Sequence, residues 1–118
     1  MKKIIRRFYH AISGILHALK NDHSVQLHVL IAILVLPSAY FILSPVALWE
    51  VLLVLLGWFL ILITEIQNSA LEAALDKLHP ERHNNIKQSK DMAAGAVLLS
   101  GVYFFLVLGI LILSRTVN

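Results

Sequence analysis

Three long apolar segments set the first limit on how this chain can fold. They run from Leu27 to Leu43, from Ala47 to Thr64 and from Met92 to Leu113. Crossing roughly 30 Å of bilayer hydrocarbon takes about 20 residues of α-helix, so each segment predicts a transmembrane helix. The 118 residues are 58% hydrophobic with a mean hydropathy of +0.78, which is too apolar for a soluble core of this size. We therefore predict an all-α membrane protein whose residues 1–118 form a single domain.

The residues before the first span predict a separate surface helix. Apolar side chains recur there at helical spacing while basic side chains take the other positions, which is typical of a helix lying in the membrane interface. The apolar set is Ile4, Ile5, Phe8, Ile12, Ile15, Leu16 and Leu19. We assign residues 1–24 to this helix. No short apolar stretch with a cleavage site precedes Leu27, so we expect no removed signal peptide.

Lys and Arg residues are distributed unevenly around the spans. They occur before the first span and between the second and third, but only Arg115 follows the third. The two groups are Lys2, Lys3, Arg6, Arg7 and Lys20, and Lys77, Arg82, Lys87 and Lys90. Since positively charged flanks stay in the cytoplasm, we expect a cytoplasmic amino terminus. Residues 65–91 then form a cytoplasmic helix extension, ended by Pro80, and a loop.

Polar side chains follow the second span at helical spacing. Glu65, Asn68, Ser69, Glu72 and Asp76 are separated by three or four residues and share one helix face. A solvated face beyond a membrane span explains this pattern as well as a functional site does. However, Glu65 directly follows the apolar run, and an ionisable group there indicates function. A carboxylate at this boundary suits a general base for a lipid hydroxyl, and carboxylates at this spacing suit Mg²⁺.

A second polar block contains Lys87, Lys90 and Asp91. Lysines here could neutralise phosphate charge, because phosphoryl transfer depends mainly on positioning and electrostatics. The simpler explanation is that they only fix membrane orientation. A non-enzymatic alternative for the acidic face is a membrane subunit that relays ions. That alternative has no evident use for the Lys90 and Asp91 pair.

Several classes of site are absent from the sequence. There is no cysteine, no Gly-rich phosphate loop and no protein-kinase signature, and the six histidines form no zinc-binding pattern. The basic residues form two short clusters rather than a continuous face, which does not favour a nucleic-acid partner. Any chemistry therefore depends on carboxylates, His, Asn and Lys.

Two motifs give the chain a family resemblance. One is Glu65-x-x-Asn68-Ser69-Ala-x-Glu72-Ala, and the other is Lys87-x-x-Lys90-Asp91-x-Ala-Ala-Gly95. Together with Phe8-x-x-Ala11-x-x-Gly14-Ile15, they resemble the small prokaryotic diacylglycerol kinase family, which includes the undecaprenol kinases. This resemblance covers essentially the whole chain. It implies a homotrimeric helical bundle in a bacterial cytoplasmic (inner) membrane, with active sites shared between subunits, that uses ATP to phosphorylate a lipid.

The resemblance also assigns roles to individual residues. Glu65 matches the catalytic base, which Asn68 supports. Glu72 matches a metal-binding glutamate, and Asp22 stands where its partner would be, so the pair would bind Mg²⁺. Lys90 would bind phosphate oxygens, with Asp91 in the nucleotide site or its supporting shell. Lys87 and His83 complete the expected nucleotide-binding set.

The resemblance favours undecaprenol as the acceptor and leaves diacylglycerol as the alternative. His28, together with Lys87 in the Lys-x-x-Lys-Asp block, matches the undecaprenol kinase branch. The sequence Asp22-His23-Ser24 departs from that branch, which commonly has Glu-Arg-Asn before the first span.

Overall fold

The computed structural model describes residues 2–81 and 83–117, and Met1, Arg82 and Asn118 lie outside the described residues. Within these ranges the chain forms four helices, which are α1 (Lys2–Asn21), α2 (His23–Leu43), α3 (Leu48–Leu78) and α4 (Asn84–Thr116). Of these, α2, α3 and α4 are long and apolar enough to cross a membrane. The all-α fold with three candidate membrane spans is therefore confirmed.

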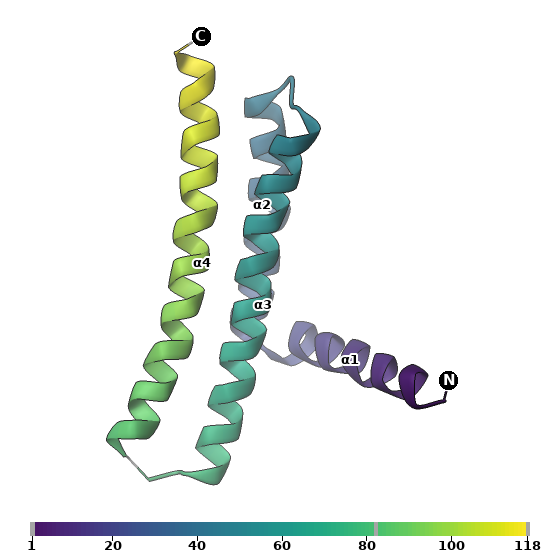
Figure 1. Cartoon of the computed structure of the whole chain (residues 1–118), viewed down its shortest axis with the longest axis vertical. Coiled ribbons are helices and arrows are strands. Elements are labelled where there is room, and N and C mark those ends of the chain that lie inside the picture. Colours follow the sequence, from purple (N-terminus) through teal and green to yellow (C-terminus); the bar gives the residue numbers. More distant parts are fainter. Residues whose placement is uncertain (1, 82, 118) are drawn as a thin grey trace.

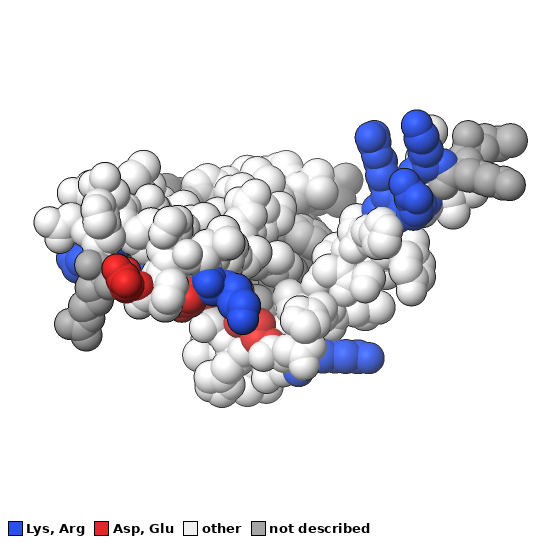
Figure 2. Space-filling view, turned by 90° about the horizontal axis from the view of Figure 1, so that it is seen from below, with Lys and Arg blue, Asp and Glu red and all other residues white. Residues whose placement is uncertain are grey.

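The first helix points away from the other three. Figure 1 shows α1 pointing sideways from the bundle. Below the level of α1, α3 and α4 continue to the loop that joins them. Its apolar side chains are exposed, as Ile4 and Phe8 illustrate with exposed fractions of 69% and 70%. Seen from the loop end, Figure 2 shows Lys and Arg side chains gathered at the free end of α1. An exposed apolar face with nearby cationic groups suits contact with lipid along the helix.

The bundle is held mainly by the packing of α3 against α4. The buried apolar side chains at its centre are Leu43, Val54, Ile61, Phe104, Leu108 and Leu111. Gly57 allows this approach, because a Cβ there would lie 3.0 Å from the Phe104 ring and 3.3 Å from the Phe104 Cα. Small residues commonly permit such close helix contacts in membranes. Large apolar side chains elsewhere on α2, α3 and α4 are exposed, as expected for surfaces that meet lipid.

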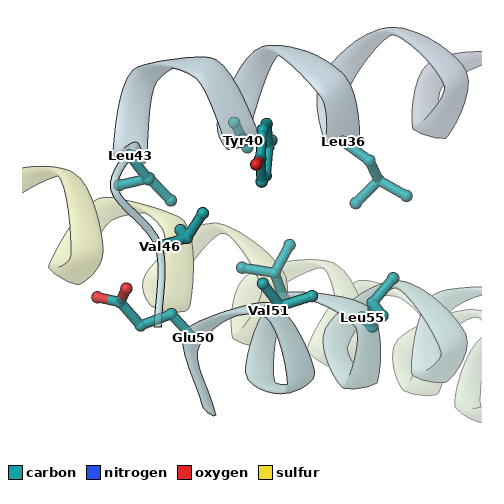
Figure 3. A pocket seen from close by; sticks show the side chains of 9 residues that line it. Leu36, Tyr40, Leu43, Val46, Glu50, Val51 and Leu55 are labelled. Carbon is teal, nitrogen blue, oxygen red and sulfur yellow. The ribbon is translucent and has the colours of Figure 1, made fainter. Parts of the chain in front are cut away.

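An ion pair closes the end of the bundle at which α2 and α3 connect. Glu50 is only 2% exposed, and its two carboxylate oxygens each accept a hydrogen bond of 2.7 Å from the Arg115 guanidinium of α4. Arg115 also donates to the carbonyls of Leu43 and Pro45, at 3.2 and 3.3 Å. Figure 3 shows the Glu50 carboxylate turned toward α4 and away from the apolar side chains of an adjoining pocket. Arg115 thus ties the end of α4 to both neighbouring helices.

We expect Arg115→Ala to lower the unfolding temperature in detergent, because it leaves the buried Glu50 carboxylate without its positively charged partner. The double variant Glu50→Gln/Arg115→Ala should unfold at a higher temperature than Arg115→Ala alone. Arg6→Ala, on the exposed part of α1, is the control and should change the unfolding temperature little. Equal effects of Arg115→Ala and Arg6→Ala would show that the ion pair does not stabilise the bundle.

Candidate active site

The polar face of α3 begins inside the bundle. Helix α3 continues through residues 65–78 because no helix breaker occurs before Pro80. Glu65 is 6% exposed, and within the described chain its carboxylate has no hydrogen-bond partner. The Asn68 Oδ1 is fully buried and also unpartnered among the described residues. Two neighbouring acceptors that lack donors could receive a hydroxyl proton and a polar group from a substrate.

A hydroxyl pair connects α3 to α4 beside this point. The Thr64 hydroxyl donates to the Ser100 hydroxyl at 3.2 Å, and Ser100 donates to the carbonyl of Ala96. Ser100 is only 8% exposed. Its importance was missed from the sequence, although a serine within an apolar span is the kind of signal that could have indicated it.

Asp22 lies between α1 and α2 and reaches the same face of α3. Its carboxylate caps α2 by accepting the backbone N–H of Val25 at 3.0 Å, and the Ser69 hydroxyl of α3 is close enough to affect its pKa. Partial burial acts to raise the pKa of Asp22, but the nearby Ser69 hydroxyl and the backbone N–H groups outweigh burial and hold this pKa below its ordinary value. Asp22 is therefore an anion at neutral pH. The structure thus places this predicted metal ligand beside the polar face of α3.

Lys90 extends from α4 toward α3. Its ammonium group donates to the Asp76 carboxylate at 2.9 Å, and Glu72, one turn closer to the membrane, also attracts its charge. Only 31% of the Lys90 side chain is exposed, compared with 68% for Asp76. The sequence placed Asp76 on the polar face but gave no indication that it pairs with Lys90.

The remaining predicted nucleotide-binding residues lie at the start of α4. Lys87 and Asp91 form an exposed ion pair of 3.2 Å one helical turn apart. The His83 imidazole caps α4 by accepting the backbone N–H of Asn85 at 3.3 Å. In Figure 2, acidic and basic side chains lie next to each other at the end formed by α3 and α4.

A cavity of about 480 Å³ brings these residues together. His83, Lys87, Lys90 and Asp91 all line it. Asp76, His79 and Glu81 line it as well, and sequence reasoning did not assign the last two to any site. We refer to it as the loop cavity. The four residues expected to bind the nucleotide therefore share one polar cavity of the structure.

The candidate residues form two groups rather than one compact cluster. Along α3, Glu72 lies about 10 Å from Glu65, and Asp76 lies about 16 Å from it. In the part of the chain that the structure describes, no three His, Asp or Glu side chains converge as a metal site. Mg²⁺ commonly takes one or two protein carboxylates and completes its shell with phosphate and water, so Glu72 and Asp22 offer suitable oxygen donors. The geometry allows a substrate that spans the distance from the loop cavity to Glu65.

Comparisons with known proteins identify the family of the chain. Residues 9–113 match the family described as prokaryotic diacylglycerol kinase. The chain is 32% identical over 96 residues to a diacylglycerol kinase of Pseudomonas aeruginosa, covering 81% of this chain and 76% of the relative. It is 29% identical over 102 residues to an undecaprenol kinase of Bacillus subtilis, covering 86% and 81%. The chain therefore belongs to the prokaryotic diacylglycerol kinase family and is a lipid kinase.

Proposed function

We propose that this protein transfers the γ-phosphate of ATP to the hydroxyl of undecaprenol, which gives undecaprenyl phosphate. One observation supports the proposal most strongly. The buried Glu65 carboxylate lies on the face of α3 that continues to the loop cavity, which is lined by lysines. A lipid hydroxyl at the membrane boundary and a nucleotide from the cytoplasm can approach such a face from opposite ends.

Glu65 is the proposed general base. It removes the proton of the lipid hydroxyl as the oxygen attacks the γ-phosphate, and Asn68 positions the reacting group. This role suits a carboxylate that is enclosed by protein but has no hydrogen bond from the described residues. Exclusion of water also protects the phosphate from hydrolysis.

The loop cavity is the proposed nucleotide site. Lys90 and Lys87 attract the phosphate oxygens, while Asp91 and His83 contact the remainder of the nucleotide or hold these lysines in place. When ATP is bound, Lys90 exchanges the Asp76 carboxylate for a phosphate. Glu72 and Asp22 are the proposed ligands of Mg²⁺, which would supply charge neutralisation on the phosphates.

Undecaprenol is proposed over diacylglycerol because of two residues in particular. His28 and Lys87 match the branch of the family that acts on undecaprenol, and His28 lines a groove between the spans. Relatives of both names match the chain at similar identity, so the proposal depends on these residues rather than on the degree of similarity.

We further propose a homotrimer in a bacterial cytoplasmic membrane, with the amino terminus in the cytoplasm and active sites shared between subunits. The unequal distribution of Lys and Arg supports this orientation. The wide separation of the two groups of site residues within one chain is consistent with completion of the site by a neighbouring subunit.

An ion-relay role fits the structure less well. Of the described residues, Glu50 and Glu65 are the buried carboxylates, and they lie about 22 Å apart along α3 with apolar residues between them. Glu50 is also held by Arg115. A relay needs polar groups close enough to exchange ions, and this span does not provide them.

The test is phosphate transfer from labelled ATP by the purified protein in detergent, with undecaprenol and diacylglycerol offered together. We expect kcat/KM for undecaprenol to exceed that for diacylglycerol by about tenfold or more, and we expect a chelator to abolish transfer to both. Preference for diacylglycerol would overturn the choice of acceptor. Full transfer in the presence of chelator would overturn the metal dependence. Failure to label either lipid would overturn the proposed reaction.

A further inference from the structure

A second cavity lies within the membrane-spanning part of the bundle. It has a volume of about 140 Å³ and is lined by side chains of α2, α3 and α4. We call it the three-helix groove and define it by His28 and Ala32 of α2, Trp58 and Ile61 of α3, and Gly101 and Phe104 of α4. Apart from His28 and the indole N–H of Trp58, which is buried without a partner among the described residues, these side chains present hydrocarbon or aromatic surface. The groove therefore suits an apolar occupant.

The groove lies on the same face of α3 as Glu65 of the candidate active site. On α3, Ile61 and Trp58 precede Glu65 by four and seven residues, so the three side chains share one helix face. Ile61 lies about 6 Å from Glu65 along the helix axis and Trp58 about 10 Å from it. A lipid whose hydroxyl reached Glu65 would therefore place the start of its chain against these residues.

Gly101 keeps the groove open on the α4 side. A Cβ added at Gly101 would find no atom within 4 Å, although this glycine lines the groove. Gly57 on α3 is different, because a Cβ there would meet the Phe104 ring. Gly57 thus serves helix packing, whereas the space at Gly101 is not used by any described part of the chain.

We propose that the three-helix groove holds the hydrocarbon chain of the acceptor lipid next to its hydroxyl, and that Gly101 determines the space available to this chain. The inference rests on the proposed function, since it assigns a binding site to the acceptor of that reaction. The occupant is a single hydrocarbon chain, as undecaprenol provides. A second chain, such as that of diacylglycerol, would have to remain outside in the bilayer.

The groove acts by positioning rather than by hydrophobic attraction. Lipid tails surround the protein and are as apolar as the side chains that line the groove, so transfer of the chain gains little from the hydrophobic effect. Packing against Trp58 and Phe104 instead fixes where the chain begins and hence where its hydroxyl lies. Small displacements of a reacting group can lower rates strongly, so a partly filled groove should reduce productive binding.

The pocket next to Glu50, shown in Figure 3, is a less suitable site for the same chain. It has a similar volume of about 140 Å³ and an apolar lining that includes Leu36, Val51 and Leu55. However, it lies toward the opposite end of the bundle, and its α3 lining, from Glu50 to Leu55, is about 15 to 22 Å from Glu65 along the helix. A chain in that pocket could not determine the position of the hydroxyl at Glu65.

The first test uses Gly101→Leu, with Gly109→Leu as the matched control. Both glycines are on α4 and have open space at the Cβ position, but Gly109 does not line the groove. We expect Gly101→Leu to lower kcat/KM for undecaprenol about tenfold or more, with the KM for ATP unchanged. Gly109→Leu should have little effect. Equal effects of the two variants would overturn the proposal. A change in oligomer mass seen only with Gly101→Leu would also overturn it, because it would indicate that a second copy of the chain fills the groove.

The second test does not depend on activity. Trp58 and Trp49 are the two tryptophans, so a Trp49→Phe background leaves Trp58 as the reporter. Undecaprenol brominated on its first isoprene units should quench Trp58 fluorescence more than an equal amount of brominated phospholipid, and Gly101→Leu should remove this excess. Equal quenching by both lipids would overturn the groove assignment even if transfer occurs. Excess quenching without transfer would overturn the proposed reaction but support the groove.

Discussion

Glu65→Gln is expected to lower kcat by about 10²- to 10⁴-fold, which is the usual contribution of a positioned general base. The amide has nearly the shape of the carboxylate but cannot take a proton from the lipid hydroxyl. Glu65 is buried on α3, and a replacement of similar size should leave helix packing intact. Initial rates should be measured with saturating ATP and acceptor, so that the loss is read in kcat.

Gln67→Ala provides the control for this variant. Gln67 lies two positions further along α3 on its exposed side, away from Glu65. The Gln67→Ala variant should have the same kcat as the unchanged protein. Oligomer mass and helix content should be the same for both variants. A Glu65→Gln protein with unchanged kcat would show that Glu65 is not the base.

The membrane fold could be predicted from the sequence because it depends on local patterns. The apolar runs predict the three spans, and the lack of a helix breaker between Glu65 and Pro80 predicts that α3 extends beyond the membrane. The helices are longer than the apolar runs, since α2 begins at His23 and α4 at Asn84. Capping by Asp22 and His83 explains these starts.

Contacts between distant parts of the chain could not be predicted in this way. Spacing placed Glu65, Asn68 and Glu72 on one face, but Lys90 reaches Asp76 only because of the path of the loop between α3 and α4. Arg115 was counted merely as a charge after the last span, whereas its pairing with Glu50 depends on the relative depth of α3 and α4. Such pairings follow from tertiary packing, which sequence periodicity does not specify.

The groove illustrates the same limit. His28, Trp58 and Gly101 belong to three different helices, and each alone has the sequence context of an ordinary packing residue. Only the rotation of each helix about its own axis brings these residues around one space. The sequence suggested that His28 relates to the choice of acceptor, and the structure gives it a location beside that space.

Lys90→Ala is expected to lower kcat/KM for ATP about hundredfold, because a fixed positive charge near the transferring phosphate is lost. The KM for the lipid should change little, since Lys90 lines the loop cavity rather than the three-helix groove. Thermal stability should also change little, because the Asp76 partner is largely exposed and such ion pairs contribute little. Lys77→Ala, near the end of α3, is an exposed lysine control outside the cavity lining.

Asp76→Asn separates a phosphate-binding role of Lys90 from a purely structural one. This variant breaks the same ion pair but leaves the Lys90 charge in the loop cavity. If Lys90 binds phosphate, Asp76→Asn should change kcat/KM for ATP by no more than a few-fold, far less than Lys90→Ala, because the lysine charge remains available to the phosphate. If the two variants lost equal activity, the ion pair itself would be the important feature. The loop cavity would then lose its strongest support as the nucleotide site, while the role of Glu65 would still be decided by its own variant.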